Sequence, residues 1–525
     1  MRTRRTRARA GLAGPRLPGP RLPGPGLPGP GLPAARAPVP LGPTLLGLTG
    51  AVVVALAAPR LVADPVRWWF SLDLGGAARG LLYAGMLALV GAWAWLGREL
   101  RAGARLTSRR LAAVGALWSL PLLASPPLFS HDLYSYLAQG WIARLGLDPY
   151  HVAPSALAGL GHPGVLDAVS PFWRRTTAPY GPLFLALVRT VVGVTGSGLV
   201  AGAVAVRLVV AGVGLGLLAA YLPRLARRLG GSPAGAVWLV MLNPLVLFQL
   251  VAPGHNDLLM AGVMVAGVTV ALSGAPLLGI VVCALAATVK LPALVAAAFI
   301  AASWIRDAPD GTRARRAAWA ALAVAITLAV VSAASGLGFG WISGGVFTTP
   351  RRVHLAITPG TALGWTLATG LRGAGLGVDV RSLESGCGLL ALGLVAALAL
   401  RSLWDVRWPG LAVRLAVVLV AFALGGPAAW PWYLSWGLVL LVCAPRRAWS
   451  TGAIAAASVL GAFVVKPDGI LALPIQSAPA VLCLYLACGG IAWWAWLRRR
   501  AAVAVAVAEA GTGGEVPEPG ELALR

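Results

Sequence analysis

The chain has 525 residues, of which 58% are apolar and only 11% are charged, and its mean hydropathy is +0.79. A soluble globular domain carries about 25% charged residues, so this composition excludes a protein covered by a water-facing surface. The net charge of +26 is typical of loops that set membrane topology, and nucleic acid is the weaker interpretation of it. We expect an all-α polytopic membrane protein with about 12–14 transmembrane helices.

The two ends of the chain differ from its centre. Residues 1–42 are rich in Arg, Pro and Gly and contain a GPxLP repeat, which is incompatible with a helix or a central strand. We expect a disordered cytoplasmic tail there, a transmembrane domain over residues 43–500, and a disordered acidic tail over residues 501–525. The cysteines lack metal-ligand spacing and are expected to pack in apolar surroundings. We expect no metal and no cofactor.

The first apolar runs define the expected topology. Runs at about 43–62, 76–97 and 111–127 predict three spans, with an Arg-rich loop between the second and the third. Arg-rich loops are typical of the cytoplasmic side. The polar stretch 130–182 is therefore expected on the outer face. The short apolar piece after it is expected to be an interfacial or re-entrant helix, so residues 130–197 form the outer loop. A span at about 198–222 returns to Arg-rich cytoplasm.

Two later features are unusual. Runs at 236–252 and 256–273 predict a hairpin whose outer tip is the sequence PGHND, residues 253–257. Residues 277–304 must leave and return on the same side, which favours two half-helices with a turn at Lys290. A charge in an apolar run is costly unless it is paired or faces a cavity. A second polar outer segment is expected at 348–365. The remaining spans are expected near 317–335, 386–403, 409–427, 433–444, 450–466 and 476–497, with both termini cytoplasmic.

The scarce polar groups of the outer face are the candidate site. They suit group transfer from an anionic lipid, because a carboxylate can deprotonate a hydroxyl and cations can stabilise a phosphate leaving group. Aromatic rings can stack on sugars. The candidates are His131, Asp132, His255, Asn256, Asp257, Arg351, Arg352, His354, Trp432 and Tyr433, with Lys290 approaching from below.

Each candidate has a structural alternative. Asp132, or Ser130 before it, can be the N-cap of an interfacial helix. The Arg351–Arg352 pair can contact lipid headgroups instead of gripping a phosphate, and residues 255–257 can be a solvated loop tip. Asp148 and Asp167 are expected to be turn residues.

Several motifs together resemble a known family. They are HDLYSYLAQG, GLDPY, TAPYGPLF, LNPLVLFQLVAPGHNDLLM, TVKLPAL and WPWYLSW, spread over about residues 110–440. This set is similar to the actinobacterial polyprenol-phosphomannose-dependent α-1,6-mannosyltransferases of the MptA/MptB type, in the GT-C superfamily.

The resemblance implies a GT-C fold with an acidic catalytic residue in the first large outer loop. It also implies a polyprenyl-phosphate mannose donor, a lipid-anchored mannan acceptor of the lipomannan and lipoarabinomannan pathway, and inversion without a metal at the plasma membrane. By this similarity Asp132 is the general base and His131 its neighbour. Many GT-C enzymes carry two adjacent acids, whereas this chain has His-Asp, which leaves open whether Asp257 completes the site. The other implied roles are donor-phosphate binding by Lys290, Arg351 and Arg352, and sugar binding by His255, Asn256, Asp257, Tyr180, Trp432 and Tyr433.

A transporter or flippase of a lipid-linked sugar is the alternative from another class. Transporters usually show inverted repeats and midplane sites on broken helices. No repeat is visible here and most polar groups share one face, which favours an enzyme, although Lys290 in its half-helix turn suits a transporter. A third possibility is a GT-C transferase of another lipid-linked sugar, such as arabinose or glucose.

Overall fold

The computed structural model of the protein describes residues 39–62, 66–70, 74–343, 357–426, 428–490, 494, 497 and 498. The expected tails, apart from residues 39–42, lie outside the described residues. So do Arg351, Arg352 and His354. The described chain is helical, and its one pairing of extended backbone is an isolated bridge between Val465 and Leu471.

The helices of the first half follow the expected runs closely. They are α1 (Leu41–Leu61), η1 (Gly75–Ala77), α2 (Ala78–Arg101), α3 (Ser108–Ala124), α4 (Asp132–Arg144), η2 (Pro154–Ala158), α5 (Pro163–Ala168), α6 (Pro182–Thr195), α7 (Leu199–Arg228), α8 (Pro233–Met241), α9 (Pro244–Val246), η3 (Leu247–Val251) and α10 (Asp257–Leu272).

The second half continues in the same way, and a last helix covers residues 478–490. Its other elements are α11 (Pro276–Ala287), η4 (Leu291–Ala293), α12 (Leu294–Arg306), α13 (Arg313–Ser335), α14 (Gly340–Ser343), α16 (Pro359–Gly373), α17 (Val380–Trp404), η5 (Trp408–Gly410), α18 (Leu411–Gly425), η6 (Pro431–Leu434), α19 (Ser435–Leu441), α20 (Ala448–Phe463) and η7 (Ile475–Ser477).

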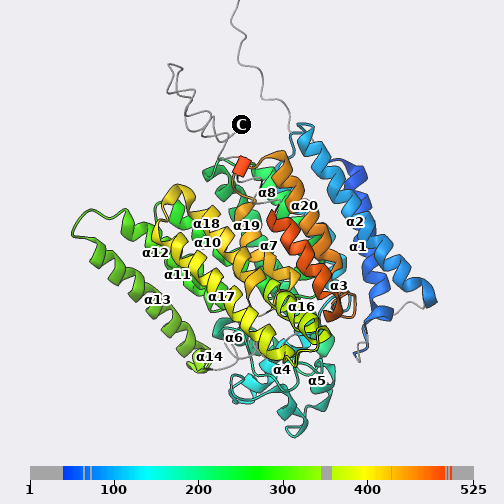
Figure 1. Ribbon diagram of the computed structural model, residues 1–525. Coiled ribbons are helices and arrows are strands. Elements are labelled where there is room, and N and C mark those ends of the chain that lie inside the picture. The colour runs from blue at the N-terminus through cyan, green and yellow to red at the C-terminus, as the bar shows by residue number, and fades with distance from the viewer. Residues whose placement is uncertain are drawn as a thin grey trace, which may run out of the picture. The chain divides into compact units, whose positions relative to one another are not determined.

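Length and composition identify the helices that can cross a bilayer. Seven of the described helices are long and apolar enough, and seven further apolar helices are shorter, between 10 and 17 residues. A span needs about 20 residues of helix, and more if it is tilted, so none of the shorter helices reaches that length by itself. The prediction of an all-α polytopic membrane protein is confirmed. Figure 1 shows α4 and α5 at the lower end of the helix bundle and α8 near its upper end.

The predicted break at Lys290 is present and is filled by a distant segment. α11 ends at Ala287 and α12 begins at Leu294, which leaves backbone carbonyls between them without helical partners. The amide of Gly181 donates to the Val289 carbonyl at 3.1 Å, and the amide of Leu183 donates to the Thr288 carbonyl at 3.1 Å. The start of α6 is therefore hydrogen-bonded into the gap between the two half-helices.

The second part of the polar segment 348–365 is helical, which the hydropathy pattern did not predict. Its first part, to residue 356, is not described, but α16 begins at Pro359, behind a capping box made by Thr358 and Thr361. Gly360 and Gly364 let this helix approach α17 closely, since a Cβ at Gly364 would lie 2.5 Å from the Cα of Glu384. Small residues four apart allow helix backbones to pack closely in membranes. The Gly360–Gly364 spacing therefore favours a packed helix, although the hydropathy of the segment is too low to predict one.

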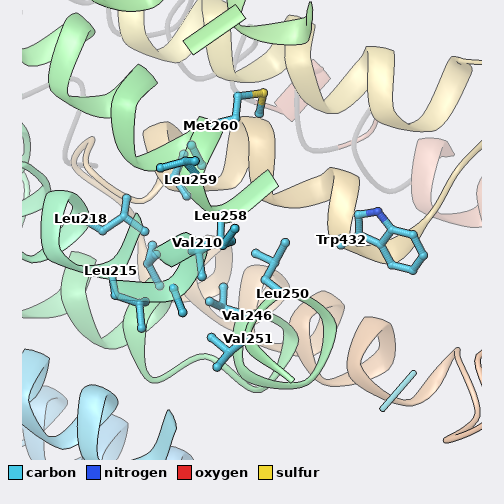
Figure 2. Close-up of a cluster of buried hydrophobic side chains, with 14 of the residues drawn as sticks. Val210, Leu215, Leu218, Val246, Leu250, Val251, Leu258, Leu259, Met260 and Trp432 are labelled. Atoms are coloured by element: carbon cyan, nitrogen blue, oxygen red, sulfur yellow. The ribbon is translucent and has the colours of Figure 1, made fainter. Parts of the chain in front are cut away.

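The core beneath the predicted PGHND tip is apolar. Val210 and Leu218 of α7, Leu250 of η3 and Leu258 of α10 are buried. Figure 2 shows these side chains together, with the indole of Trp432 beside them. Protein interiors pack densely, and their side chains keep few alternative positions. Leu250 and Leu258, which flank the PGHND segment in the sequence, are therefore held in place by this cluster.

Candidate active site

Asp132 stands at the first turn of α4, directly after a strained stretch of backbone. Phe129 has φ 65°, the one positive φ among the described non-glycine residues, and its amide donates to the Pro467 carbonyl at 3.0 Å. Such conformations cost free energy and persist where the surroundings impose them. Asp132 follows Phe129 by three residues, at the start of α4.

The carboxylate of Asp132 is not used as a helix cap. The N-cap position is His131, which makes no side-chain cap hydrogen bond, and the amide of Asp132 donates to Ser130 Oγ at 3.2 Å. The side chain of Asp132 is 16% exposed. The alternative in which the Asp132 carboxylate serves as an N-cap is therefore excluded. Ser130 Oγ, and not this carboxylate, accepts a backbone hydrogen bond at the helix start.

His255 faces Asp132 from the segment between η3 and α10. Its Nε2 atom lies 3.6 Å from Asp132 Oδ2, and its side chain is completely buried. Its Nδ1 atom lies 2.7 Å from the carbonyl oxygen of Gln249. Gln249 belongs to η3, a π-helical turn, and such turns occur frequently at functional sites. Burial lowers the pKa of His255, while the carboxylates of Asp132 and Asp257 partly oppose that shift.

Asp257 and Lys290 form a buried ion pair. Lys290 Nζ lies 2.8 Å from each carboxylate oxygen of Asp257, and Trp436 Nε1 donates to Asp257 Oδ1 at 2.6 Å. The side chain of Asp257 is 1% exposed and that of Lys290 is 14% exposed. Lys290 lies in an apolar run, where a charge is costly unless it is paired, and Asp257 provides that pairing. The PGHND segment is buried, so it is not a solvated loop tip.

An aromatic group covers this ion pair and the His255 ring. Lys290 Nζ lies 4.7 Å from the ring centre of Tyr433, and Tyr433 stacks on Trp436 at 4.3 Å. His255 packs on Trp432 at 4.1 Å, and Trp430 stacks on Trp432 at 4.7 Å. Trp432 is only 4% exposed. Trp430, which is partly exposed, has the more open ring for a sugar.

Tyr136 and Tyr180 form the neighbouring wall. Their rings meet edge to face at 4.9 Å, and Phe184 packs on Tyr136 at 4.9 Å. Burial raises the pKa of Tyr136 and that of Tyr180 well above their usual value, and the charge of Asp132 adds to both shifts. Both phenols are therefore neutral, and they can donate hydrogen bonds. The structure places Tyr180 in the predicted group, whereas Tyr136 was not predicted.

Several buried polar atoms in this group are without partners. Among the described residues, neither side-chain polar atom of Asn256 has a hydrogen-bond partner, and the same holds for Nε2 of His131 and Nε2 of His255. Buried polar groups are nearly always hydrogen-bonded. The hydroxyl groups of a ligand can supply the hydrogen bonds that these buried atoms lack.

Arg207 is a buried residue that the hydropathy pattern missed. It lies within α7 and donates from Nη1 to the carbonyls of Leu122 and Ala252, and from Nη2 to the carbonyl of Ser125. It thereby joins the end of α3, which leads to Asp132, to the segment that leads to His255. A Cβ at Gly254, whose φ is +75°, would lie 2.4 Å from Arg207 Cγ. An Arg in the middle of an apolar run was the available signal.

The remaining predicted residues divide into two groups. Asp148 is a turn residue as expected, since its Oδ1 accepts from the amide of Tyr150 at 2.8 Å and its Oδ2 pairs with His151 Nδ1 at 2.7 Å. Arg351 and Arg352 lie outside the described residues, so their predicted contact with phosphate stays a prediction.

Comparison with known proteins agrees with the motifs. Residues 40–306 match the MptA_B family model, described as alpha-(1->6)-mannopyranosyltransferase, N-terminal domain, and residues 360–498 match the MptB C-terminal domain. No solved structure matches the chain.

Two curated relatives cover most of the chain. The alpha-(1->6)-mannopyranosyltransferase A of Mycobacterium tuberculosis is 36% identical over 407 residues, which cover 74% of this chain and 75% of the relative. A probable alpha-(1->6)-mannopyranosyltransferase of Mycolicibacterium smegmatis is 34% identical over 496 residues, with 83% and 86% covered. The resemblance seen in the motifs is confirmed, and the chain belongs to the MptA/MptB family of alpha-(1->6)-mannopyranosyltransferases.

Proposed function

We propose that this membrane mannosyltransferase moves mannose from polyprenyl-phosphate mannose to an α-1,6-mannan acceptor at the outer face of the plasma membrane. The transfer is a single displacement with inversion, and Asp132 is the general base. The acceptor hydroxyl attacks the anomeric carbon while the lipid phosphate leaves from its opposite side.

The observation that carries this proposal is the contrast between the two carboxylates of the site. Asp257 is held by both oxygens on Lys290 and by the Trp436 indole, and it is buried. Asp132 is partly exposed, and the group that faces it is an imidazole. A general base must reach the proton that it takes. Asp132 has that access, and Asp257 has a structural role in positioning Lys290.

The donor phosphate is proposed to bind near Lys290, with Arg351 and Arg352 as further ligands. The charge of Lys290 is already matched by Asp257, so Lys290 would contribute its remaining N–H donor and a fixed position more than a free positive charge. Asn256 and Tyr180 supply hydrogen-bonding groups toward the sugar, His255 stands beside the Asp132 carboxylate, and Trp432 with Tyr433 forms the apolar wall.

The outer-face location rests on the basic residues at helix ends. Arg98 and Arg101 end α2, Arg227 and Arg228 end α7, and Arg306 ends α12. Positive residues near span ends are typical of the cytoplasmic side. Asp132 follows α3, a 17-residue helix that starts just after the first of these clusters, so one crossing by α3 would put Asp132 on the opposite side.

The test is an assay of purified protein in detergent with labelled polyprenyl-phosphate mannose and short α-1,6-mannosides as acceptors. We expect an elongated product with a new α-1,6 linkage by linkage analysis. Polyprenyl-phosphate arabinose and glucose are the competing donors. Transfer from either of them in place of mannose contradicts the donor assignment. A second assay uses the protein reconstituted in lipid vesicles. If lipid-linked sugar crosses the vesicle membrane there and no product forms with any donor, the protein is a flippase.

A further inference from the structure

The imidazole of His255 has an orientation that its hydrogen bonds define. The Gln249 carbonyl oxygen, 2.7 Å from Nδ1, can only accept a hydrogen bond. Nδ1 therefore carries the hydrogen of the neutral ring, and Nε2 carries the lone pair. It is this basic nitrogen, without a hydrogen-bond partner among the described residues, that faces Asp132 Oδ2 at 3.6 Å.

Two groups that only accept hydrogen bonds thus face one another across this contact. A carboxylate and an unprotonated imidazole nitrogen have no attraction at 3.6 Å unless a proton lies between them. The arrangement is unfavourable in the resting state and becomes favourable once one proton enters. We infer that His255 accepts the proton that Asp132 removes from the acceptor hydroxyl, so that the base of this enzyme is an Asp132–His255 pair. This inference rests on the function proposed above.

The charges around His255 support uptake of one proton. The groups that face it are Asp132 from α4, Asp257 at the start of α10 and Lys290 before η4. Two carboxylates and one ammonium leave one negative charge, which an imidazolium would neutralise. Burial lowers the pKa of His255, so the ring is neutral before the reaction and is free to receive a proton.

The step balances as follows. The acceptor O–H bond breaks, its oxygen bonds to the anomeric carbon, and the bond from that carbon to the phosphate oxygen breaks, with the electron pair leaving on the lipid phosphate. The proton passes to Asp132 and then to Nε2 of His255, which leaves a carboxylate beside an imidazolium. Product release and proton loss to water restore the neutral ring.

The decisive variant is His255→Asn, because an Asn amide can keep the hydrogen bond to the Gln249 carbonyl while it removes the basic nitrogen. His151→Asn is the matched control, since His151 is exposed and pairs with Asp148 away from the site. For His255→Asn we expect kcat to fall by about 100-fold, within the range of acid–base catalysis. The acid limb of the kcat profile should move to lower pH, because the amide that replaces the imidazole does not titrate there. The control should match the wild type.

An unchanged pH profile in His255→Asn overturns the inference, whether or not kcat falls, because loss of packing alone does not move the limb. Wild-type activity in the same assay keeps this result separate from a failure of the proposed function. Nitrogen-15 NMR of labelled histidine in the solubilised wild type needs no activity. We expect a hydrogen on Nδ1 and none on Nε2 at neutral pH, and the opposite tautomer overturns the inference.

Discussion

At the scale of single residues, two aspartates in one site have opposite environments. Asp257 is surrounded by Lys290 and Trp436 and has no open side, whereas Asp132 has an exposed edge and a basic nitrogen next to it. The same side chain therefore stabilises a cation in one place and is available for proton transfer in the other. Because Asp257 is already paired with Lys290, the geometry favours Asp132 over Asp257 as the proposed base.

The first prediction concerns the base. Asp132→Asn should lower mannosyl transfer by about 10²–10⁴-fold, because the amide cannot accept the hydroxyl proton. The measurement is the initial rate with labelled donor, normalised to the amount of protein in the membrane. Asp148→Asn is the control and should keep most of the activity, since Asp148 only shapes a turn. Comparable rates for Asp132→Asn and wild type would remove Asp132 as the base.

The second prediction concerns the buried pair. Asp257→Leu or Lys290→Met alone should destabilise the protein by about 3–5 kcal/mol, because each leaves an uncompensated buried charge. The double variant should recover much of that loss. The measurement is thermal unfolding in detergent. Arg401→Met is the control, because Arg401 forms an exposed pair with Asp405 and such pairs contribute about 0–1 kcal/mol. Additive losses in the double variant would contradict the pairing.

At the scale of elements, the site is built where helices stop. α3 ends before Asp132, the π-helical η3 ends before His255, and the α11–α12 helix pair is interrupted at Lys290. Irregular backbone at membrane depth is tolerated where it is buried in protein or lines a cavity. Arg207 and the α6 start supply the hydrogen bonds that these interruptions leave open.

The third prediction tests the contact between α6 and the interrupted helix. A Cβ at Gly181 would lie 2.1 Å from the Thr288 carbonyl oxygen, so Gly181→Ala should force the two backbones apart. We expect a loss of about 1–3 kcal/mol in stability and a clear fall in activity, because Lys290 follows Thr288 by two residues. Thermal unfolding and the transfer assay are the measurements.

Gly164→Ala is the control for this variant, since a Cβ at Gly164 meets no atom within 4 Å. Gly164 lies in the same segment before α6, and its replacement should leave both properties unchanged. If Gly181→Ala behaves like Gly164→Ala, the approach of α6 to the helix break is looser than the hydrogen bonds indicate.

At the scale of the whole molecule, the fourth prediction is the orientation in the membrane. After Cys387, Cys483 and Cys488, the cysteines that are not buried, are replaced by Ser, His151→Cys and Arg227→Cys each carry a single accessible thiol. We expect a membrane-impermeant maleimide to label His151→Cys in intact cells and Arg227→Cys only after permeabilisation, because basic helix ends remain cytoplasmic. The reverse pattern would place the site inside.

Much of the fold could be predicted from hydropathy and charge. The three N-terminal helices, the long α7 and the interruption at Lys290 all appear where the apolar runs and the buried Lys indicate them. α16 was missed because a Gly- and Thr-rich helix has low hydropathy and depends on close packing against α17. The role of Arg207 was not predicted, because an apolar run that contains one Arg has the hydropathy of an ordinary transmembrane span.

The sequence by itself determined the class of molecule, the family and the list of polar residues, because composition, span length and motif spacing are local properties of the chain. Only the tertiary structure decided which of those residues act on one another. Asp132 and His255 are separated by more than a hundred residues, as are Asp257 and Trp436. Their contacts exist because the start of α4 meets the segment between η3 and α10, and because α10 packs against α19. In that packing Asp257 is buried against Lys290, whereas Asp132 keeps a partly exposed side chain.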